Sequence, residues 1–310
     1  MIVVLAGGVG AARFLQGLVQ VVPQNEITVI GNTGDDREFY GLHVSPDLDI
    51  VTYTLAGVVD ETHGWGIRND TYHTMGQLTQ YGNDDWFMLG DKDLATHIHR
   101  TNLLRQGKTL SEVTDDLRKQ FGLGIRLLPM TDQPVATNII TPVGQLHFQE
   151  YMVKRRSVDE VQGVLFVGVQ QARPAPGVLD ALKEADAILL APSNPIVSIG
   201  TILAVPGIHD ALHETSSMII AVSPIIGGAP IKGPADKLMS GLGMEVSAVG
   251  VARCYRDFLD VMIIDEQDDH LVSEIEDLGI PTIATNTIMR GEESKAALAR
   301  KTLEAAGLSF

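Results

Sequence analysis

The first stretch of this sequence with residues that can do chemistry is a glycine-rich turn near its start. The apolar run Ile2–Ala6 leads into Gly7–Gly10, and a helical pattern begins at Ala11. Glycines let backbone NH groups approach an anion closely, and the N-terminus of a helix adds partial positive charge. With the guanidinium of Arg13 in the first helical turn, the pattern predicts a phosphate or nucleotide site. The alternative is an ordinary strand–helix turn.

The fingerprint of dinucleotide-binding proteins is incomplete at this turn. Arg13 occupies the position of the third glycine, and the second apolar run, Ile27–Gly31, leads into Asn32 rather than into Asp or Glu. A nicotinamide-dependent oxidoreductase is therefore the weaker interpretation.

Acidic residues gather in two segments after the second apolar run. Asn32–Asp36 should lie beside the glycine-rich turn, and Asp47 and Asp49 follow in His43–Asp49. Carboxylates at the ends of neighbouring segments can hold Mg²⁺, a hard ion that prefers carboxylates, water and substrate phosphates. Asx turns and a helix cap explain the same residues, and the spacing leaves both interpretations open.

Two later loops are also placed to meet a ligand. Pro192–Pro195 follows the apolar run Ala187–Ala191, and Ser223–Gly228, with Lys232 beyond it, follows Met218–Val222. Parallel α/β sheets bind ligands at the carboxyl ends of their strands, so Ser and Asn here can donate to phosphate, ribose or a base. A structural turn is the alternative for each loop, and an isolated lysine is usually solvated.

Two other patterns are weighed for chemistry. Trp86–Leu89 is an apolar ledge that can receive a flat aromatic ring, with Asp91 or Thr96 at the ring's edge, or can simply pack onto the sheet. His209 and His213 are one helical turn apart, but a zinc hydrolase of the zincin type needs Glu at position 210 and a third ligand. The sequence therefore does not predict zinc hydrolysis.

The scaffold that must hold these residues is predicted by short apolar runs separated by helical patterns such as Gly177–Ala185 and Glu292–Ala305. Continuous apolar runs are typical of strands covered on both faces of a parallel sheet. We therefore predict an α/β fold with a Rossmann-like, mainly parallel sheet and helices on both faces. The predicted strands are Ile2–Ala6, Ile27–Gly31, Gly163–Val167, Ala187–Ala191, Met218–Val222, Ser247–Val251, Val261–Ile264 and Thr282–Ala284.

Two regions depart from this alternation. About residues 54–133 contain few strand-like runs, while Leu94–Gln106 and Ser111–Phe121 have helical patterns, with Ser111 as a start signal. We expect a helical insertion there, followed by a β-hairpin of Val135–Thr141 and Gln145–Val153. The whole chain, residues 1–310, is predicted to form one elaborated domain.

Composition restricts the partners and the compartment. The 310 residues include 39 Asp and Glu against 23 Lys and Arg, a net charge of −16, which disfavours binding of nucleic acid or an anionic membrane through bulk charge. Ala187–Ile208 is uncharged but is interrupted by prolines, so we expect no membrane partner. The single cysteine, Cys254, and the lack of a signal-peptide pattern favour a cytoplasmic protein.

Taken in order, these motifs resemble the CofD family, the 2-phospho-L-lactate transferases of coenzyme F-420 biosynthesis. The resemblance covers nearly the whole chain, including Glu61–Ile67. It implies Mg²⁺-dependent transfer of 2-phospho-L-lactate from lactyl-2-diphospho-5′-guanosine to the deazaflavin Fo, 7,8-didemethyl-8-hydroxy-5-deazariboflavin. The products are F-420-0 and GMP, and the resemblance implies a homodimer. The matching segments are Ala6–Arg13, Asn32–Asp36, Ser45–Asp49, Leu89–Asp93, Pro192–Pro195 and Ser223–Gly228.

The resemblance also implies roles for individual residues. The diphosphate is assigned to Gly8, Gly10 and Arg13. Guanosine or phosphate is assigned to Asn32, Ser193, Asn194, Pro195 and Ser198. Mg²⁺ and the reacting hydroxyl of Fo are assigned to the catalytic residue Asp49, supported by Asp35 or Asp36. The deazaflavin ring is assigned to Met88 and Asp91.

Two alternatives stay open at this point. A non-catalytic nucleotide-binding regulator of the YvcK-like type shares a similar glycine-rich opening but needs no deazaflavin pocket. Within the transferase interpretation, lactate is the expected acid, and the sequence does not separate it from phosphoenolpyruvate. The number of metal ions and the general base are also open.

Overall fold

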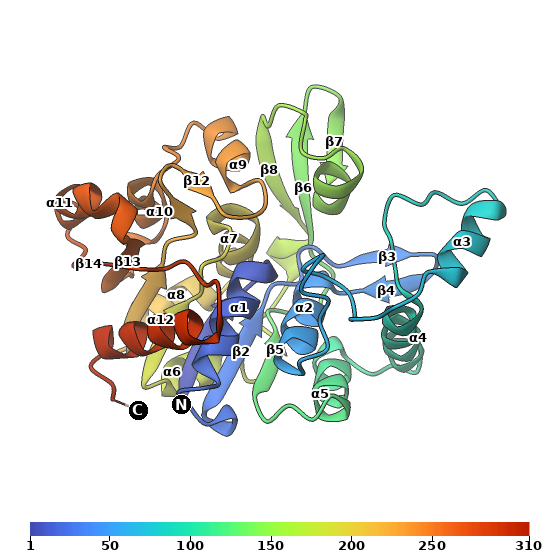
Figure 1. The fold of residues 1–310 in the computed structure, drawn as a ribbon, viewed down its shortest axis with the longest axis horizontal. Helices are drawn as coiled ribbons and strands as arrows, with labels where there is room; N and C mark the ends of the chain where they lie inside the picture. The colour runs from blue at the N-terminus through green and yellow to red at the C-terminus, as the bar shows by residue number, and fades with distance from the viewer. Residues whose placement is uncertain (310) are drawn as a thin grey trace.

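The computed structural model describes residues 1–309, and its centre is a seven-stranded sheet with the order β14-β13-β10-β9-β1-β2-β5 (Figure 1). All neighbouring pairs in this sheet are parallel. The chain winds outward from β1 in one direction to β5 and then restarts beside β1 at β9, so the topological switch point lies between β1 and β9. The strands are β1 (Ile2–Ala6), β2 (Ile27–Gly31), β5 (Arg126–Pro129), β9 (Ala187–Leu190), β10 (Met218–Val222), β13 (Val261–Asp265) and β14 (Thr282–Thr285).

Helices cover both faces of the sheet, which confirms the predicted Rossmann-like α/β fold (Figure 1). Along β1, Val4 points into the core beneath one helical layer and Leu5 into the core beneath the other, so every residue of the strand is buried. This two-sided burial is why the strands are continuously apolar. The first layer contains α1 (Gly8–Leu18), α2 (Pro46–Leu55) and α12 (Glu292–Ala305), and the second contains α6 (Val178–Glu184), α7 (Gly200–Leu203), α8 (Ile208–Glu214) and α10 (Ala248–Tyr255).

The predicted helical segment projects beside the sheet with a small hairpin (Figure 1). It has its own small core, in which Phe39, Met75 and Leu94 are buried together. The sheet takes its edge strand β5 from within residues 54–133, so the helical part ends before residue 126. Its elements are β3 (Arg37–Phe39), β4 (Leu42–Val44), α3 (His73–Gln80), α4 (Asp91–Arg105) and α5 (Leu110–Gln120).

A separate antiparallel sheet contains the predicted hairpin. β6 (Ala136–Thr141) pairs with β7 (Gly144–His147), and on its other side with β8 (Gly163–Val167). The prediction that the second hairpin strand continues to residue 153 is wrong, because a π-helical turn occupies Glu150–Lys154. The apolar run Gly163–Val167 is a strand, but it belongs to this sheet and its Leu165 is 47% exposed.

One predicted strand and one predicted helix start are wrong. Ser247–Val251 is not a strand: Ser247 is the N-cap of α10, and its Oγ accepts from the Gly250 NH at 3.1 Å. A short apolar run does not distinguish a strand from a buried helix, which explains the error. Helix α5 is capped by Thr109 rather than Ser111, because Thr109 and Glu112 form a reciprocal capping box.

The remaining elements are short. They are β11 (Ile225–Ile226), β12 (Ala229–Pro230), α9 (Ala235–Gly241), α11 (Val272–Glu276), a second π-helical turn (Pro195–Ile199) and 3₁₀ turns at Gln24–Glu26, Val169–Gln171 and Glu266–Leu271. Across residues 1–309, no single helix has the length and apolar character to cross a membrane. Only Pro195–Leu203 combined with Ile208–Glu214 meets those two criteria, and an 81° bend separates the two segments.

Candidate functional site

The glycine-rich turn and the loop after β9 meet at the switch point of the sheet. A Cβ on Gly10 would lie 2.2 Å from the Pro192 carbonyl oxygen, so only glycine allows this approach. The Gly7 NH donates to the Ser193 hydroxyl at 3.3 Å. Both loops follow the carboxyl ends of their strands, where α/β proteins bind ligands.

The start of helix α1 retains donors for an anion. The Gly8 NH donates to Asp47 Oδ1 at 2.9 Å, so this NH and that of Gly7 are already used. The first four NH groups of a helix lack partners within it, which leaves those of Val9 and Gly10. Gly8 has a φ of +73°, and a Cβ there would meet no atom within 4 Å, so open space adjoins the turn.

Two cations without acidic partners lie beside this helix start. The pKa of Lys232 is lowered by desolvation and by the neighbouring Arg13 guanidinium. The Lys232 ammonium donates to the His63 carbonyl oxygen at 3.2 Å, which brings the loop that carries Trp65 to the same place. Within residues 1–309, neither Arg13 nor Lys232 forms an ion pair. Adjacent unpaired cations in so acidic a protein make a suitable site for a diphosphate.

Asn32 is a buried link between the loops. Its Nδ2 group donates to Asp47 Oδ2 at 2.8 Å and to the Val197 carbonyl oxygen at 3.3 Å, and its Oδ1 accepts from the Gly34 NH at 2.9 Å. Both amide hydrogens are used, so in this structure Asn32 orders the site from beneath. Its assigned contact with guanosine or phosphate stays a prediction.

The carboxylates of Asp35, Asp36 and Asp47 lie near Asn32, and of the three only Asp36 has a basic side chain of the described residues beside it, with the His43 Nε2 3.0 Å from its Oδ2. Burial raises the pKa of Asp35 well above its usual value, and the charges of Asp47 and Asp36 raise it further. Burial also raises the pKa of Asp47 to about 6, although the hydrogen bonds from Asn32 and Gly8 oppose the shift. Asp35 Oδ1, Asp36 Oδ1 and the Thr33 hydroxyl are buried without a hydrogen-bond partner in the described part of the chain. Crowded, partly unpartnered oxygens of this kind fit a hard divalent cation such as Mg²⁺.

Asp49 lies in a different environment from Asp47, although both are on α2. The carboxylate of Asp49 forms a buried ion pair with Arg100 of α4, with Oδ2 accepting from Nη1 at 3.1 Å. In the same network the His97 Nε2 lies 3.1 Å from Asp93 Oδ1, and the Tyr53 hydroxyl donates to Asp93 at 2.7 Å. The guanidinium competes with a metal ion for the oxygens of Asp49. Asp47, unlike Asp49, forms no ion pair within residues 1–309, and its charge raises the pKa of Asp35.

The residue roles drawn from the family resemblance included neither Asp47, which lies beside Asp35, nor Arg100, which pairs with Asp49. Asp47 was within a motif that the sequence indicated, but nothing local separates it from Asp49. Asp93, His97 and Arg100 recur at helical spacing on one face of α4, and this spacing was the available signal for the buried network.

The loop after β9 is ordered by its own side chains. Asn194 Oδ1 accepts from the NH groups of Ile196 and Val197 at 2.9 and 3.2 Å and so caps the turn that begins at the buried Pro195. Ser198 is buried against Gly7, and its hydroxyl makes no hydrogen bond with another residue in 1–309. Ser198 is thus the residue of this loop with an uncommitted hydroxyl.

The residues assigned to the deazaflavin lie on the helical projection. Met88 is 37% exposed, beside a cluster in which the rings of Phe39 and Phe87 stack at 3.9 Å. The Asp91 carboxylate accepts from the Thr71 hydroxyl at 2.6 Å and from the NH groups at the start of α3, and these bonds lower its pKa. The structure thus brings Gly8, Arg13, Asp35 and the β9 loop together, while Met88 and Asp91 form a second group joined to them through α4 and α2.

The fold is that of a Rossmann-like α/β protein, with a glycine-rich turn and two cations that form no ion pair within residues 1–309 at the switch point of its sheet. Residues 2–297 match the family model described as CofD, 2-phospho-L-lactate transferase. The chain belongs to this family of transferases, as its motifs indicated.

Full-length relatives carry two different names. A protein of Streptomyces griseus, 49% identical with 98% of both chains covered, is named phosphoenolpyruvate transferase. A protein of Methanosarcina mazei, 41% identical with 98% of this chain and 99% of that one covered, is named 2-phospho-L-lactate transferase. Among solved structures, a protein from Bacillus halodurans has a TM-score of 0.66 at 15% identity, with 97% of this chain and 98% of that one covered. That likeness shows the fold alone.

Proposed function

We propose that this chain transfers a phosphorylated three-carbon acid from a guanosine diphosphate donor to the ribityl hydroxyl of Fo, with release of GMP. The observation that carries the proposal is that two neighbouring cations, Arg13 and Lys232, lie at the start of α1 without acidic partners in the described residues. The buried carboxylates Asp35, Asp36 and Asp47 lie next to them. A diphosphate ester bound through a divalent cation needs cationic side chains for its phosphate oxygens and, beside them, carboxylates for the metal ion.

The reaction is a displacement at phosphorus. The Fo hydroxyl oxygen attacks the phosphorus atom that carries the three-carbon acid, the bond from that atom to the bridging oxygen breaks, and GMP leaves with the electron pair. The hydroxyl proton passes to a base. Positioning and charge neutralisation dominate such transfers, and Arg13, Lys232 and the NH groups of Val9 and Gly10 are the donors available for the diphosphate.

The proposed metal ligands are Asp35 and Asp47, with Asp36 beside them. Mg²⁺ bound there supplies positive charge to the phosphate oxygens. The carboxylates hold the ion, and Asn32 and the Gly8 NH orient Asp47 through its two oxygens. For Asp49 we propose a role on the Fo side, because its partner Arg100 belongs to α4, the helix that follows Met88.

The identity of the acid is a choice between two closely related donors. Lactate is the expectation from the family resemblance. The relatives named phosphoenolpyruvate transferase are 42–49% identical to this chain, and those named 2-phospho-L-lactate transferase are 40–42% identical, which supports the unsaturated acid as a second candidate. The acids differ by one carbon–carbon double bond, so competition between the two donors, with products separated by mass, distinguishes them.

A nucleotide-binding regulator has weaker support. The likeness to the Bacillus halodurans structure concerns the fold alone, whereas the relatives that cover nearly the whole chain are named as transferases.

The proposal is tested by titrating the protein with Fo, followed by the intrinsic fluorescence of Fo, with and without GDP and Mg²⁺. We expect saturable Fo binding, and GMP release when a donor is added. Asp49→Asn should weaken Fo binding or turnover, whereas Asp277→Asn, a change at an exposed residue, should match the unmodified protein. Near-normal turnover and Mg²⁺ dependence of Asp49→Asn would contradict the role of Asp49. Tight guanine-nucleotide binding without any Fo response would favour the regulator.

A further inference from the structure

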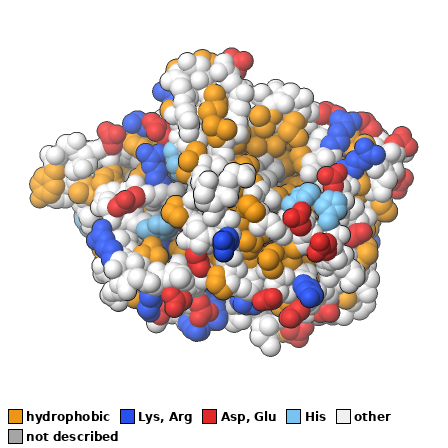
Figure 2. Space-filling model, turned by 180° about the vertical axis from the view of Figure 1, so that it is seen from behind, with side chains coloured by type: hydrophobic (Ala, Val, Ile, Leu, Met, Phe, Trp, Pro, Cys, Tyr) orange, Lys and Arg blue, Asp and Glu red, His pale blue; other side chains and the backbone are white. Residues whose placement is uncertain are grey.

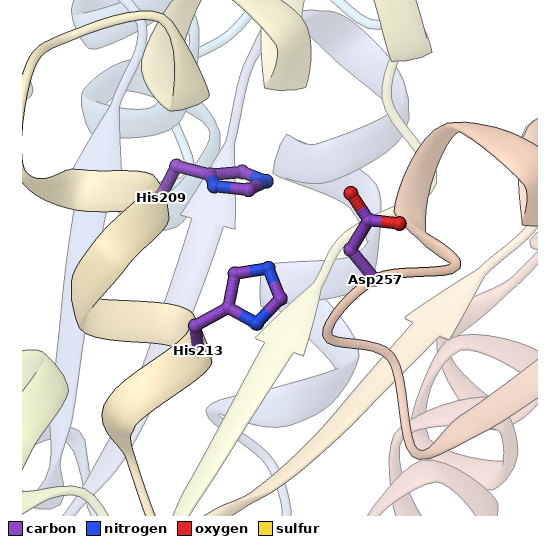
Figure 3. Close-up of side chains that lie close together, drawn as sticks. All are labelled: His209, His213 and Asp257. Atoms are coloured by element: carbon purple, nitrogen blue, oxygen red, sulfur yellow. The ribbon is translucent and has the colours of Figure 1, made fainter.

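A second cluster of ligand-type side chains lies outside the candidate active site. His209 and His213 are one turn apart on α8, and Asp257 lies on the loop between α10 and β13, facing them (Figure 3). One potential ligand atom from each of the three residues lies within 4.8 Å of the others. The sequence lacked a third ligand for the histidine pair, and the fold brings one in from 44 positions beyond His213.

No other residue within 1–309 competes with a metal ion for the side chains of His209, His213 and Asp257. In the described residues, no hydrogen bond or ion pair involves their side chains; the nearest bonds at this edge belong to other groups, such as Asp260, which accepts from the Ile219 NH. The two imidazole rings pack edge to face at 4.9 Å, and Phe258 packs against them at 5.5 and 6.3 Å between ring centroids. The ligand atoms are therefore held close together and are uncommitted.

The types of ligand atom at this cluster indicate which metal ions it can bind. Two imidazole nitrogens and one carboxylate oxygen suit Zn²⁺ and similar transition metals, whereas Mg²⁺ prefers oxygen ligands alone. Zinc bonds of about 2.0–2.2 Å put tetrahedral ligands roughly 3.3 Å apart, so small side-chain rotations close the site. His213 and Asp257 also line an open cavity of about 260 Å³, which has room for water as a further ligand.

The cluster lies away from the glycine-rich turn. His213 and Asp257 precede β10 and β13, at the amino ends of the parallel strands, whereas the turn and the β9 loop follow the carboxyl ends. On the face of the molecule in Figure 2, histidine side chains lie next to acidic ones. We propose that His209, His213 and Asp257 form a Zn²⁺ site that clamps α8 to the loop before β13, separate from the Mg²⁺-dependent chemistry.

The test is calorimetric titration of the full chain with ZnCl₂ in excess Mg²⁺. We expect one saturable Zn²⁺ site and a rise in Tm on binding, because the ion joins two elements of the folded state. His213→Ala and Asp257→Asn should each weaken binding by more than about tenfold. His270→Ala, at an exposed histidine elsewhere, should bind as the unmodified protein does. Co²⁺ in place of Zn²⁺ should give the visible spectrum of a four-coordinate site.

Two results of the Zn²⁺ titration would overturn the proposal. An unmodified protein that shows no saturable Zn²⁺ binding overturns it, as do variants that retain full affinity. Circular dichroism in EDTA checks that each variant folds. Asp257→Asn keeps the test valid even where a histidine variant does not fold, because Asp257 is exposed and forms no ion pair within residues 1–309. Neither result depends on the proposed transferase reaction, which is assayed with Fo.

Discussion

Two groups of buried carboxylates near α2 differ in how far basic side chains neutralise them. In the first cluster, Asp49 is neutralised by Arg100, and Asp93 lies beside His97 with its pKa lowered by hydrogen bonds and charge from His97, despite burial. In the second, Asp35 and Asp47 have no cationic partner, and their pKa values are raised by burial.

The difference supports our proposal that the Asp35–Asp47 cluster binds an ion, while Asp49 is held in place by Arg100. A buried charge is tolerated when it is paired, and otherwise takes up a proton or an ion from solution. The Arg100 network joins α4 to α2 from within the chain. We propose that an ion from solution completes the Asp35–Asp47 cluster, which lies next to the glycine-rich turn through the bond from the Gly8 NH to Asp47.

The largest expected effect comes from breaking the paired cluster. Arg100→Met leaves Asp49 buried without a cation and should lower the free energy of unfolding by about 3–5 kcal/mol. Urea unfolding measures this loss, and adding Asp49→Asn to the variant should recover much of it. Arg253→Met, which removes an exposed ion-pairing residue, should cost no more than about 1 kcal/mol. Equal losses in Arg100→Met and Arg253→Met would remove the distinction between the clusters.

Neutralising the unpaired cluster should instead affect activity. Asp47→Asn should reduce turnover about 100- to 1000-fold by removing a charge that holds the metal near the reacting phosphate. At neutral pH without Mg²⁺, the free energy of unfolding should not fall, since relief of repulsion offsets a weakened hydrogen bond. Steady-state assays across Mg²⁺ concentrations measure the first effect. Unchanged Mg²⁺ dependence would move the metal site away from Asp47.

The pH dependence of stability should separate the clusters as well. The folded-state pKa of Asp47, about 6, is above the usual 3.8, so the native state binds the proton more tightly than the unfolded state. Its stabilising contribution is therefore present below pH 3.8 and is lost as the pH rises through about 6, by roughly 2–3 kcal/mol. Urea unfolding in EDTA should show this loss relative to Asp47→Asn. Mg²⁺ at about 100 times its Kd should restore about 2.7 kcal/mol. Matching pH profiles of the two proteins would contradict the raised pKa.

The smallest expected effect concerns the cations beside the glycine-rich turn. Lys232→Met should raise the KM for the guanosine diphosphate donor about tenfold with little change in kcat, as expected for a residue that contributes to ground-state binding. Lys108→Met, at an exposed lysine on the helical projection, should leave both constants unchanged. A fall in kcat with constant KM would instead assign Lys232 to the transition state.

Much of the architecture was predictable because local chemistry and fold agree. Ile2–Ala6, Ile27–Gly31 and Met218–Val222 are β1, β2 and β10 with the predicted bounds, since strands covered on both faces are apolar along their length. Ser247–Val251 was misassigned because five apolar and small residues carry no periodicity, and the Ser247 cap becomes evident only once α10 has formed. The edge strand β5 was missed because Arg126–Pro129 is short and lies at the end of the segment whose patterns are mainly helical.

By itself the sequence determined the family, the α/β class and the segments that carry the site, because glycine turns, apolar runs and clustered carboxylates act locally. Only the tertiary structure distinguished the environments of the aspartates. Asp47 and Asp49 are two positions apart, and their environments differ because α2 presents one to the glycine-rich turn and the other to Arg100 of α4. It also decided that Asp257 meets two distant histidines. Pairing of charges across elements depends on packing, and packing is set by the whole chain.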